Sequence, residues 1–329
     1  MNDRGPMRRA AAVQLEAVVG DVAENLRRLD RLVADAAAQG AELIAIPEFF
    51  TSRIPFDAGV HEAVLPLDNQ ALDALKAWAA RDRCWIGGSM LVADGDAVFN
   101  RYHLVSPEGV VYRHDKDLPT MWENAFYGPG HDDGVFETPI GRVGAAVCWE
   151  LIRTATVRRL RRGGVVLAMT GTHWWTLPSN WGAPVDRALA ALSRDNAAMS
   201  EGAPAAFAKR LGAPVLQASH CGHFHTRFMV MPGLRQGLSY HTEYVGATQI
   251  VDAHGQVLVS RRAQEGPGVV VADVRLETVE PLVPLEARFW IPDLHPLIRA
   301  YWHHQNVCGR AYYRQHGRMA GLHNASTLS

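Results

Sequence analysis

Residues 141–150 read GRVGAAVCWE, a short apolar run that leads into a reactive side chain. The run from Arg142 to Cys148 predicts a buried strand, because it is apolar and too short for a helix. In α/β sheets, reactive groups tend to lie just beyond the carboxyl ends of strands, where a rigid scaffold meets solvent. The stretch therefore predicts an α/β fold with a candidate nucleophile, Cys148, at the edge of its sheet.

Two more reactive side chains leave apolar runs in the same way. Glu48 follows the predicted strand of residues 42–46, and Lys116 follows that of residues 110–114. A thiol is mostly protonated at neutral pH, so a nucleophilic cysteine needs a neighbouring base or cation. Glu48 suits the base, whereas Lys116 and the amide of Trp149 suit the oxyanion of an attacked acyl carbonyl. From its position alone, however, a cysteine at a strand end is more often a small core residue.

Apolar runs and segments of helical period alternate along most of the chain. After Gly20, Asp21 and Glu24 stand where they satisfy the free amides of a helix start, and Gly40 is placed to stop that helix. The result is a β-α-β unit over residues 8–46. Further helices are predicted over 69–80, 154–162 and 185–199, further strands over 85–92, 165–169, 215–219 and 269–274, and a hairpin over 247–259. This alternation predicts one α/β domain with mixed sheets over residues 1–280.

The last part of the chain has a different character. From about Pro281 the sequence becomes aromatic and rich in histidine, which predicts a C-terminal extension over residues 281–329. A tail of this kind needs a surface on which to pack. A second subunit is the first candidate for that surface, and the chain's own domain is the second.

Composition limits the possible functions. The 329 residues are 48% hydrophobic and 20% charged, which excludes a disordered or fibrous protein. Lys and Arg total 33 against 34 Asp and Glu, so the total charge gives no reason to expect nucleic acid or an anionic membrane as partner. No apolar run reaches the roughly 20 residues that cross a bilayer, and the first residues lack the apolar segment of a secretory signal. We therefore expect a soluble, cytoplasmic protein with free thiols at Cys84, Cys148, Cys221 and Cys308.

Three local clusters permit competing interpretations. Residues 220–225 gather three His and one Cys, but their spacing matches no common metal site, so a loop at the mouth of the active site is the better interpretation. The arginines of residues 158–162 are expected to form a solvated or subunit-facing surface rather than a phosphate site. Trp174, Trp175 and Trp181 follow a predicted strand on the side of the reactive residues, where pocket lining and core packing are equally expected.

Several of these segments, taken together, resemble the nitrilase superfamily of carbon-nitrogen hydrolases. The resemblance rests on Ile46-Pro47-Glu48-Phe49-Phe50, Lys116, residues 141–150 and the late strand and turn of residues 244–255, all in the family's order. It covers residues 8–275. The resemblance implies a four-layer α-β-β-α sandwich and an oligomer that is at least a homodimer.

The resemblance also implies roles for individual residues. Glu48 matches the general base, Lys116 the lysine that stabilises the oxyanion, and Cys148 the nucleophile. Glu123 matches a second glutamate that positions the substrate and the lysine. Trp149, through its amide, and the neighbouring His173 and Trp174 are expected to bind the substrate or its oxyanion. No metal and no cofactor are implied.

Some residues depart from the family pattern. Many amidase-like members follow the nucleophile with an acidic residue, an arginine and Pro-Glu, whereas here Glu150 is followed by Leu151-Ile152-Arg153. Both Cys148-Trp149-Glu150 and residues 130–134 are closer to the nitrile-hydrolysing branch. Neither feature separates amide from nitrile, because the two reactions share the triad.

The implied activity is cysteine-dependent hydrolysis of a non-peptide carbon-nitrogen bond in a small molecule. An amide substrate is the first expectation, a nitrile the second and a carbamoylated amine the third. Two alternatives of other classes stay open: a non-catalytic binding or scaffold protein on the same fold, and a zinc hydrolase that uses His223 and His225.

Overall fold

The chain begins with the predicted β-α-β unit, formed by β1 (Met7–Leu15), α1 (Val22–Ala38) and β2 (Leu43–Glu48). A computed structural model describes residues 5–232, 237–287 and 296–328. Asp21 caps α1 by accepting a 2.9 Å hydrogen bond from the amide of Glu24. The chain then reverses at Gly40, whose φ of 84° favours glycine.

Twelve strands form one hydrogen-bonded sheet that folds into two halves. The first half has the order β5-β4-β3-β2-β1-β14 and the second β6-β7-β8-β9-β12-β13. The halves join where β1 pairs with β9, through Gln14↔Ser219 and Leu15↔His220. The other strands are β3 (Trp85–Asp94), β4 (Ala97–Val105), β5 (Val111–Asp115), β6 (Val135–Thr138), β7 (Gly141–Ala145), β8 (Leu167–Thr172), β9 (Val215–His220), β12 (Gly246–Val251), β13 (Val257–Arg262) and β14 (Gly268–Arg275).

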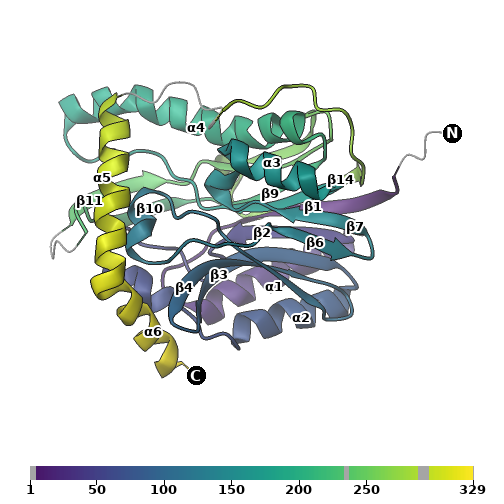
Figure 1. Cartoon of the computed structure of the whole chain (residues 1–329), viewed down its shortest axis with the longest axis horizontal. Coiled ribbons are helices and arrows are strands. Elements are labelled where there is room, and N and C mark those ends of the chain that lie inside the picture. The colour runs from purple at the N-terminus through teal and green to yellow at the C-terminus, as the bar shows by residue number, and fades with distance from the viewer. Residues whose placement is uncertain (1–4, 233–236, 288–295, 329) are drawn as a thin grey trace.

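Helices cover the outer face of each half (Figure 1). α1 and α2 (Gln70–Asp82) pack on the first half, where Val33 and Leu75 meet outward side chains such as Ile44. α3 (Thr154–Gly163) and α4 (Ala183–Leu211) pack on the second half. Between the halves lies a buried core to which both contribute, including Ala45 from β2 and Met169 from β8. The four-layer α-β-β-α sandwich is therefore confirmed.

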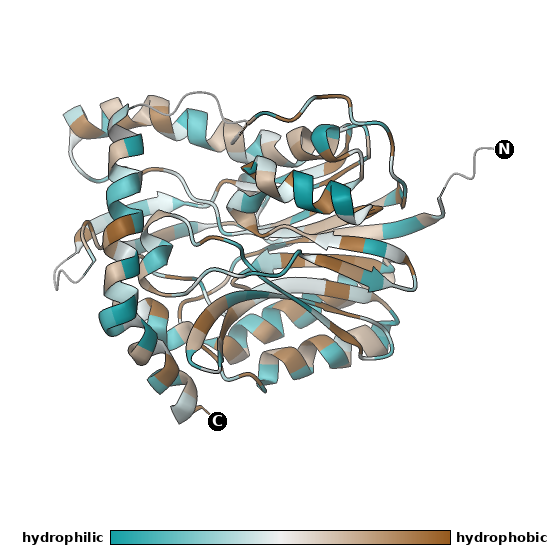
Figure 2. Cartoon of the chain, viewed as in Figure 1, coloured by the Kyte–Doolittle hydropathy of each residue, from teal (hydrophilic) through white to brown (hydrophobic). Residues whose placement is uncertain are grey.

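Two parts of the chain lie outside these layers. β10 (His223–Phe228) and β11 (Leu238–Glu243) form a separate two-stranded sheet. The C-terminal segment forms α5 (Pro296–Tyr312), a π-helical turn over residues 313–317, and α6 (Arg318–Thr327), which run along one side of the sandwich (Figure 1). Hydrophilic residues recur along α5 (Figure 2).

The C-terminal segment packs on its own domain. Gln305 donates to the main-chain oxygen of Val230 at 2.5 Å, and the amide of Val98 donates to the hydroxyl of Tyr313 at 2.9 Å. Residues 288–295 of the extension lie outside the described part of the chain. The chain's own domain was the second of the two surfaces that we predicted for the extension; the first, a partner subunit, stays a prediction. No helix within the described ranges is both long and apolar enough to span a membrane.

Candidate active site

Glu48 is the last residue of β2 and is completely buried. Its Oε1 accepts hydrogen bonds from Lys116 Nζ at 2.9 Å and from Asn100 Nδ2 at 2.8 Å. Its Oε2 accepts a bond from the amide of His173 at 2.9 Å. Burial raises the pKa of Glu48 above its ordinary value of 4.5, while the charge of Lys116 opposes that rise. The carboxylate is thus fixed in one orientation by three donors.

Lys116 lies one residue beyond β5, between two carboxylates. Its Nζ is 2.9 Å from Glu48 Oε1 and 2.9 Å from Glu123 Oε2. Burial alone would lower the pKa of Lys116, but Glu123 and Glu48 together raise it well above its ordinary value. The site therefore holds a permanent ammonium that cannot turn away from its partners.

Glu123 sits in a short 3₁₀ turn over Met121–Ala125 and is itself held in place. Its Oε2 accepts bonds from the amide of Thr120 at 2.7 Å and from the hydroxyl of Tyr127 at 2.5 Å, besides that from Lys116. Like Glu48, it is nearly inaccessible to solvent. Two carboxylates and one ammonium leave this buried group with an excess of negative charge.

Cys148 begins the 3₁₀ turn Cys148–Ile152, three residues beyond the end of β7, and is 3% exposed. The thiol lies near the Glu48 carboxylate and the main chain of His173 and interacts electrostatically with both. Burial raises the pKa of the Cys148 thiol well above its ordinary value of 9.0, and the negative charge of Glu48 adds to the rise. The resting group is therefore a neutral thiol beside a carboxylate rather than a thiolate.

The backbone near these side chains is strained. Five non-glycine residues of the described chain have positive φ, and three of them are Phe49 at 53°, Met121 at 50° and Cys148 at 54°. Each lies at or within two residues of Glu48, Glu123 or the thiol. Such conformations cost roughly 1–3 kcal/mol and cluster at functional sites. The strain turns the chain sharply at each strand end, so that the side chains point toward one another.

A close approach of β8 to β2 completes the geometry. A Cβ atom on Gly171 would come within 2.4 Å of the amide nitrogen of Glu48 and 2.6 Å of the carbonyl carbon of Pro47. Only glycine lets the two strands come this near. This contact brings the amide of His173, two residues further along, against the Glu48 carboxylate.

The structure gathers Glu48, Lys116, Glu123 and Cys148 into one buried cluster, as the sequence predicted. His173 joins the cluster through its main chain, and its ring Nε2 accepts a 2.6 Å bond from the hydroxyl of Tyr244. Burial lowers the pKa of His173 well below its ordinary value, so the ring is neutral.

Trp149 lies in the turn Cys148–Ile152, and Trp174 packs beside it. Their rings pack on each other with centroids 5.5 Å apart, and Trp174 Nε1 donates to Asn196 of α4 at 2.9 Å. Trp302 of α5 packs edge-on against Trp149 at 5.0 Å. These contacts tie the turn to two helices.

The ring of Trp175 packs against the ring of His173, with their centroids 5.8 Å apart. It packs on Phe56 at 4.4 Å and on Trp122 at 5.9 Å. Phe56 in turn meets Phe224 and Tyr240 of the β10–β11 sheet. Phe224 and Tyr240 thus bring the β10–β11 sheet into an aromatic cluster beside the site.

Sequence reasoning missed four residues that hold the cluster. They are Asn100 and Tyr127, which bond Glu48 and Glu123, His220, whose Nε2 donates to the main-chain oxygen of Glu48 at 2.7 Å, and Tyr244. Two of them carried a signal in the sequence: Tyr244 starts the family-like segment of residues 244–255, and His220 belongs to the His-rich segment that we expected at the mouth of the active site. Nothing in the local pattern around Asn100, which lies within β4, marks it as a partner of Glu48.

The His-rich segment of residues 220–225 divides between two environments. His220 is buried at the end of β9, whereas His223 and His225 lie on the exposed face of β10, where His225 stacks on His241 at 4.2 Å. Within the described ranges, no three His, Cys, Asp or Glu side chains converge as metal ligands.

The prediction for the arginine cluster was wrong for one member. Arg158 and Arg162 are exposed, as expected. Arg159 is only 14% exposed in its side chain and lies 3.5 Å from Asp117 and 3.4 Å from Glu150. Helical spacing turns this residue inward, away from the faces of its neighbours.

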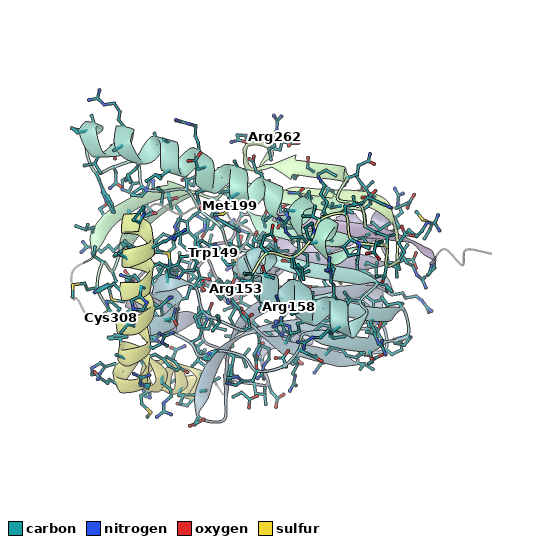
Figure 3. The ribbon with its side chains drawn as sticks, turned by 45° about the horizontal axis from the view of Figure 1, so that its top comes forward. Trp149, Arg153, Arg158, Met199, Arg262 and Cys308 are labelled. Carbon is teal, nitrogen blue, oxygen red and sulfur yellow. The ribbon has the colours of Figure 1, made fainter. Side chains whose placement is uncertain are left out.

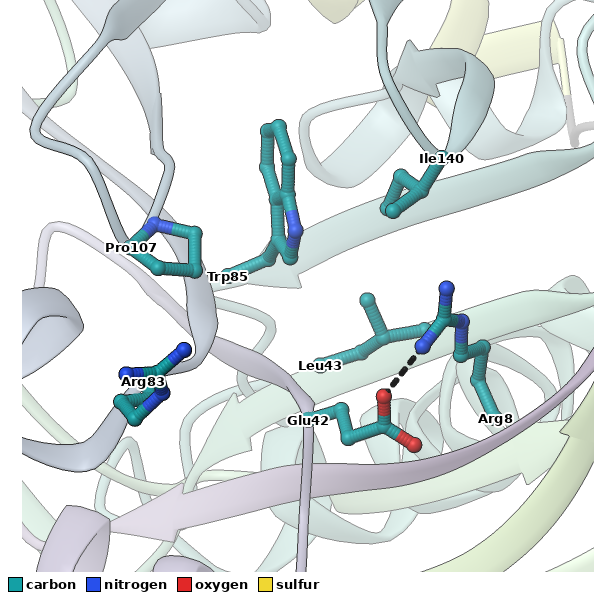
Figure 4. A pocket seen from close by; sticks show the side chains of 7 residues that line it. All are labelled: Arg8, Glu42, Leu43, Arg83, Trp85, Pro107 and Ile140. Atoms are coloured by element: carbon teal, nitrogen blue, oxygen red, sulfur yellow. Dashed lines mark hydrogen bonds and ion pairs between the residues drawn. The ribbon is translucent and has the colours of Figure 1, made fainter.

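A separate hollow lies at the opposite ends of the strands. It has a volume of about 160 Å³ and is lined by Arg8, Glu42, Leu43, Arg83, Trp85, Pro107 and Ile140. Figure 4 shows the ion pair of Arg8 with Glu42 on its wall. Glu42 precedes β2, whereas Glu48 ends it, so the hollow is a full strand away from Cys148 and its partners.

Comparison with known proteins agrees with this geometry. The family model for carbon-nitrogen hydrolases matches residues 9–283. A bifunctional nitrilase/nitrile hydratase of Lupinus angustifolius is 30% identical over 177 residues, which cover 46% of this chain and 50% of the relative. An omega-amidase of Danio rerio is 30% identical over 188 residues, or 53% of this chain and 66% of the relative. The chain thus spans about half to two thirds of the length of these relatives.

Solved structures show the same fold. An amidase from Nesterenkonia sp. superposes with a TM-score of 0.60 at 21% identity, covering 91% of this chain and 97% of that one. A carbon-nitrogen hydrolase from Helicobacter pylori G27 gives a TM-score of 0.67 at 15% identity, covering 82% and 90%. A Glu-to-Gln mutant of the Nesterenkonia amidase carries the product of Michael addition of acrylamide to its active-site cysteine. From the family match over most of its length, this chain belongs to the carbon-nitrogen hydrolase family.

Proposed function

We propose that this protein hydrolyses a non-peptide carbon-nitrogen bond, with an amide as the first substrate class, through a thioester on Cys148. The observation that carries the proposal is the buried contact set around Glu48, which joins the thiol, the Lys116 ammonium and the amide of His173. A structural core would not leave an excess of negative charge beside a thiol. A hydrolase uses that arrangement.

The first half of the reaction forms the thioester. Because the thiol is neutral, Glu48 takes its proton as the sulfur attacks the carbonyl carbon. The oxygen becomes negative and is stabilised by Lys116 and by the amide of Trp149, which lies in the first turn of a 3₁₀ helix, where no internal acceptor is available. The carbon-nitrogen bond then breaks, and ammonia leaves with the proton that Glu48 held.

The second half returns the enzyme to its resting state. Water gives a proton to Glu48 and attacks the thioester carbon, and the same oxyanion contacts act again. The carbon-sulfur bond breaks, the carboxylic acid leaves, and the proton returns from Glu48 to the Cys148 sulfur. Glu123 keeps Lys116 in position in both halves through its 2.9 Å contact.

A nitrile is the second candidate substrate, because several of the relatives are named nitrilases. Sulfur attack on a nitrile gives a thioimidate, which needs one more water before the thioester forms. The aromatic side chains Phe56, Trp122 and Trp175 beside the site favour an apolar or aromatic acyl group in either case.

The test is ammonia release from a panel of aliphatic and aromatic primary amides and nitriles. Cys148→Ala is compared with the wild type and with Cys221→Ala, which removes another buried free thiol. We expect release from amides that is lost only in Cys148→Ala. Release from nitriles alone would assign the second candidate, and activity that survives in Cys148→Ala would contradict the mechanism.

A wild type that is silent on the panel is tested further with carbamoylated amines. A non-catalytic scaffold also predicts that iodoacetamide reacts with Cys148 no faster than with the other thiols. Silence on both substrate sets together with unreactive Cys148 would reject the proposed function.

A further inference from the structure

A second buried charged group lies directly behind the catalytic cluster. Its centre is Glu150, which is completely buried and two residues beyond the nucleophile. Glu150 Oε2 accepts a 2.6 Å bond from the amide of Val147, and Oε1 accepts a 3.0 Å bond from the amide of Asp117. One carboxylate therefore bonds the residue before Cys148 and the residue after Lys116.

Side chains complete the coordination of this carboxylate. His114 Nε2 lies 3.0 Å from Glu150 Oε2, and Arg159 lies 3.4 Å from Oε1. The other ring nitrogen of His114 bonds Asp132. Burial would lower the pKa of His114, but Glu150 and Asp132 raise it to about 10, so the ring is an imidazolium at neutral pH. Glu150 is correspondingly ionised, since its pKa lies well below the ordinary value.

The charges in this group are balanced. Asp117 forms an ion pair with Arg153 at 2.6 Å and a second one with Arg159. Arg159 also contacts Glu150. Three carboxylates, Asp117, Asp132 and Glu150, thus meet two arginines and one imidazolium. Figure 3 labels Arg153, a member of this group, and Trp149, four residues before it in the chain. A balanced buried network of this kind is rigid, because removing any member leaves another charge unpaired.

The network does not touch the reacting atoms, yet it fixes the two elements that carry them. Cys148 sits at a φ of 54°, a conformation that persists only where the surrounding structure imposes it. The bond from the Val147 amide to Glu150 closes the turn on one side of the thiol. The bond from the Asp117 amide anchors the loop that presents Lys116.

We propose that Glu150 is a positioning residue that sets the distance between the Cys148 sulfur and the Lys116 ammonium. It does so by accepting the amides of Val147 and Asp117 on its two carboxylate oxygens. This inference rests on the proposed function, since it concerns the same reaction. It also explains why the residue after Trp149 is acidic although its hydrogen bonds go to Val147, Asp117, His114 and Arg159.

Two substitutions of Glu150 distinguish the effect of its hydrogen bonds from the effect of its size. Glu150→Gln keeps the shape, but both oxygens of Glu150 accept from donors, so one side of the amide would present an N–H group to another N–H group. Glu150→Asp keeps the charge, but its shorter side chain cannot reach both main-chain amides. The matched control is Glu137→Gln, which removes an exposed carboxylate that pairs with Arg142 on β7.

The measurement is steady-state and pre-steady-state kinetics on the best substrate of the panel. A misplacement of about 1 Å costs roughly 100-fold in rate, so we expect kcat to fall about 10- to 100-fold in Glu150→Gln, with slower thioester formation and KM within about twofold. The kcat of Glu150→Asp should also fall, and that of Glu137→Gln should match the wild type.

Folding is monitored separately by circular dichroism and native mass at the assay temperature. If Glu150→Gln does not fold, Glu150→Asp provides the result. Wild-type kcat in a folded Glu150 variant would overturn the inference and leave the proposed function intact, whereas a wild type without activity would overturn the proposed function itself. A rise in KM with unchanged kcat would also overturn the inference, because it would show a role in binding alone.

Discussion

Glu48 and Cys148 are both buried, and burial disfavours a negative charge on both of them at once. A base must be ionised to work, so activity should be present above the pKa of the Glu48–Cys148 pair and lost as the pH falls through it. Burial places that pKa above the ordinary glutamate value of 4.5.

We therefore expect the acid limb of kcat/KM to have its midpoint above pH 4.5. A pH profile of the wild type, with circular dichroism to exclude acid unfolding, gives the midpoint. A midpoint at or below 4.5 would show that Glu48 is better solvated than its burial indicates.

Lys116 has a structural effect besides the catalytic role that we propose for it, since it is the ammonium between Glu48 and Glu123. Lys116→Met would leave two buried carboxylates without a cation, and breaking a buried pair costs about 3–5 kcal/mol. We expect the free energy of unfolding in urea at pH 7 to fall by about that amount, together with loss of activity.

The control for this substitution is Lys76→Met, which removes an ammonium that is 42% exposed and pairs with Asp73 on the surface of α2. It should change stability by less than about 1 kcal/mol. Equal effects of the two substitutions would mean that the Glu48–Lys116–Glu123 cluster contributes no special stability.

At the scale of elements, the contact of β8 with β2 sets the position of Glu48, the proposed general base. Gly171→Ala would place a methyl group against the Glu48 amide, and overpacking of this kind costs about 1–3 kcal/mol. We expect lower thermal stability and a marked loss of kcat, because β2 must move away from Cys148. Gly202→Ala in α4 is the matched control, since its methyl group would meet nothing within 4 Å. It should be neutral or slightly stabilising.

The sequence predicted those helices and strands whose ends are set by neighbouring residues, and it failed where distant contacts set them. The first β-α-β unit followed from Asp21, Gly40 and the apolar spacing between them, all of which are local. α4 runs from Ala183 to Leu211, well past the predicted end at Met199, and it includes Pro204. Its second half is held by packing on β9 and β12, a contact that no local pattern reveals.

The same limit applies to the site. Glu48, Lys116 and Cys148 each end an apolar run, and their family-like order made them visible in the sequence. Asn100 is 52 residues from Glu48 in the sequence and becomes its partner only after β4 has joined the sheet, so this contact is tertiary and cannot be predicted from spacing or composition. Tyr127 is only four residues from Glu123, but a tyrosine at that spacing does not by itself indicate a hydrogen bond to the carboxylate.

At the scale of the whole molecule, surface apolar residues bear on the predicted homodimer. Val185 at the start of α4 and Val257 and Leu258 on β13 are 39–44% exposed. A homodimer would remove such groups from water. We expect light scattering after size exclusion to give at least twice the mass of 36.2 kDa at micromolar concentration. A monomer at every concentration would contradict the prediction.

The pairing of β1 with β14 has a consequence for synthesis. Met7 lies opposite Arg275, so β1 must wait for the synthesis of β14, the last strand of the described residues, before its second edge is covered. The contacts that complete the sheet are thus of very long range, which slows folding and leaves an open edge during translation. Glu48 and Cys148 come together only in the folded sheet, so enzymatic turnover also reports that the chain has folded completely. Nascent chains that stop before residue 268 should be inactive and depend on chaperones.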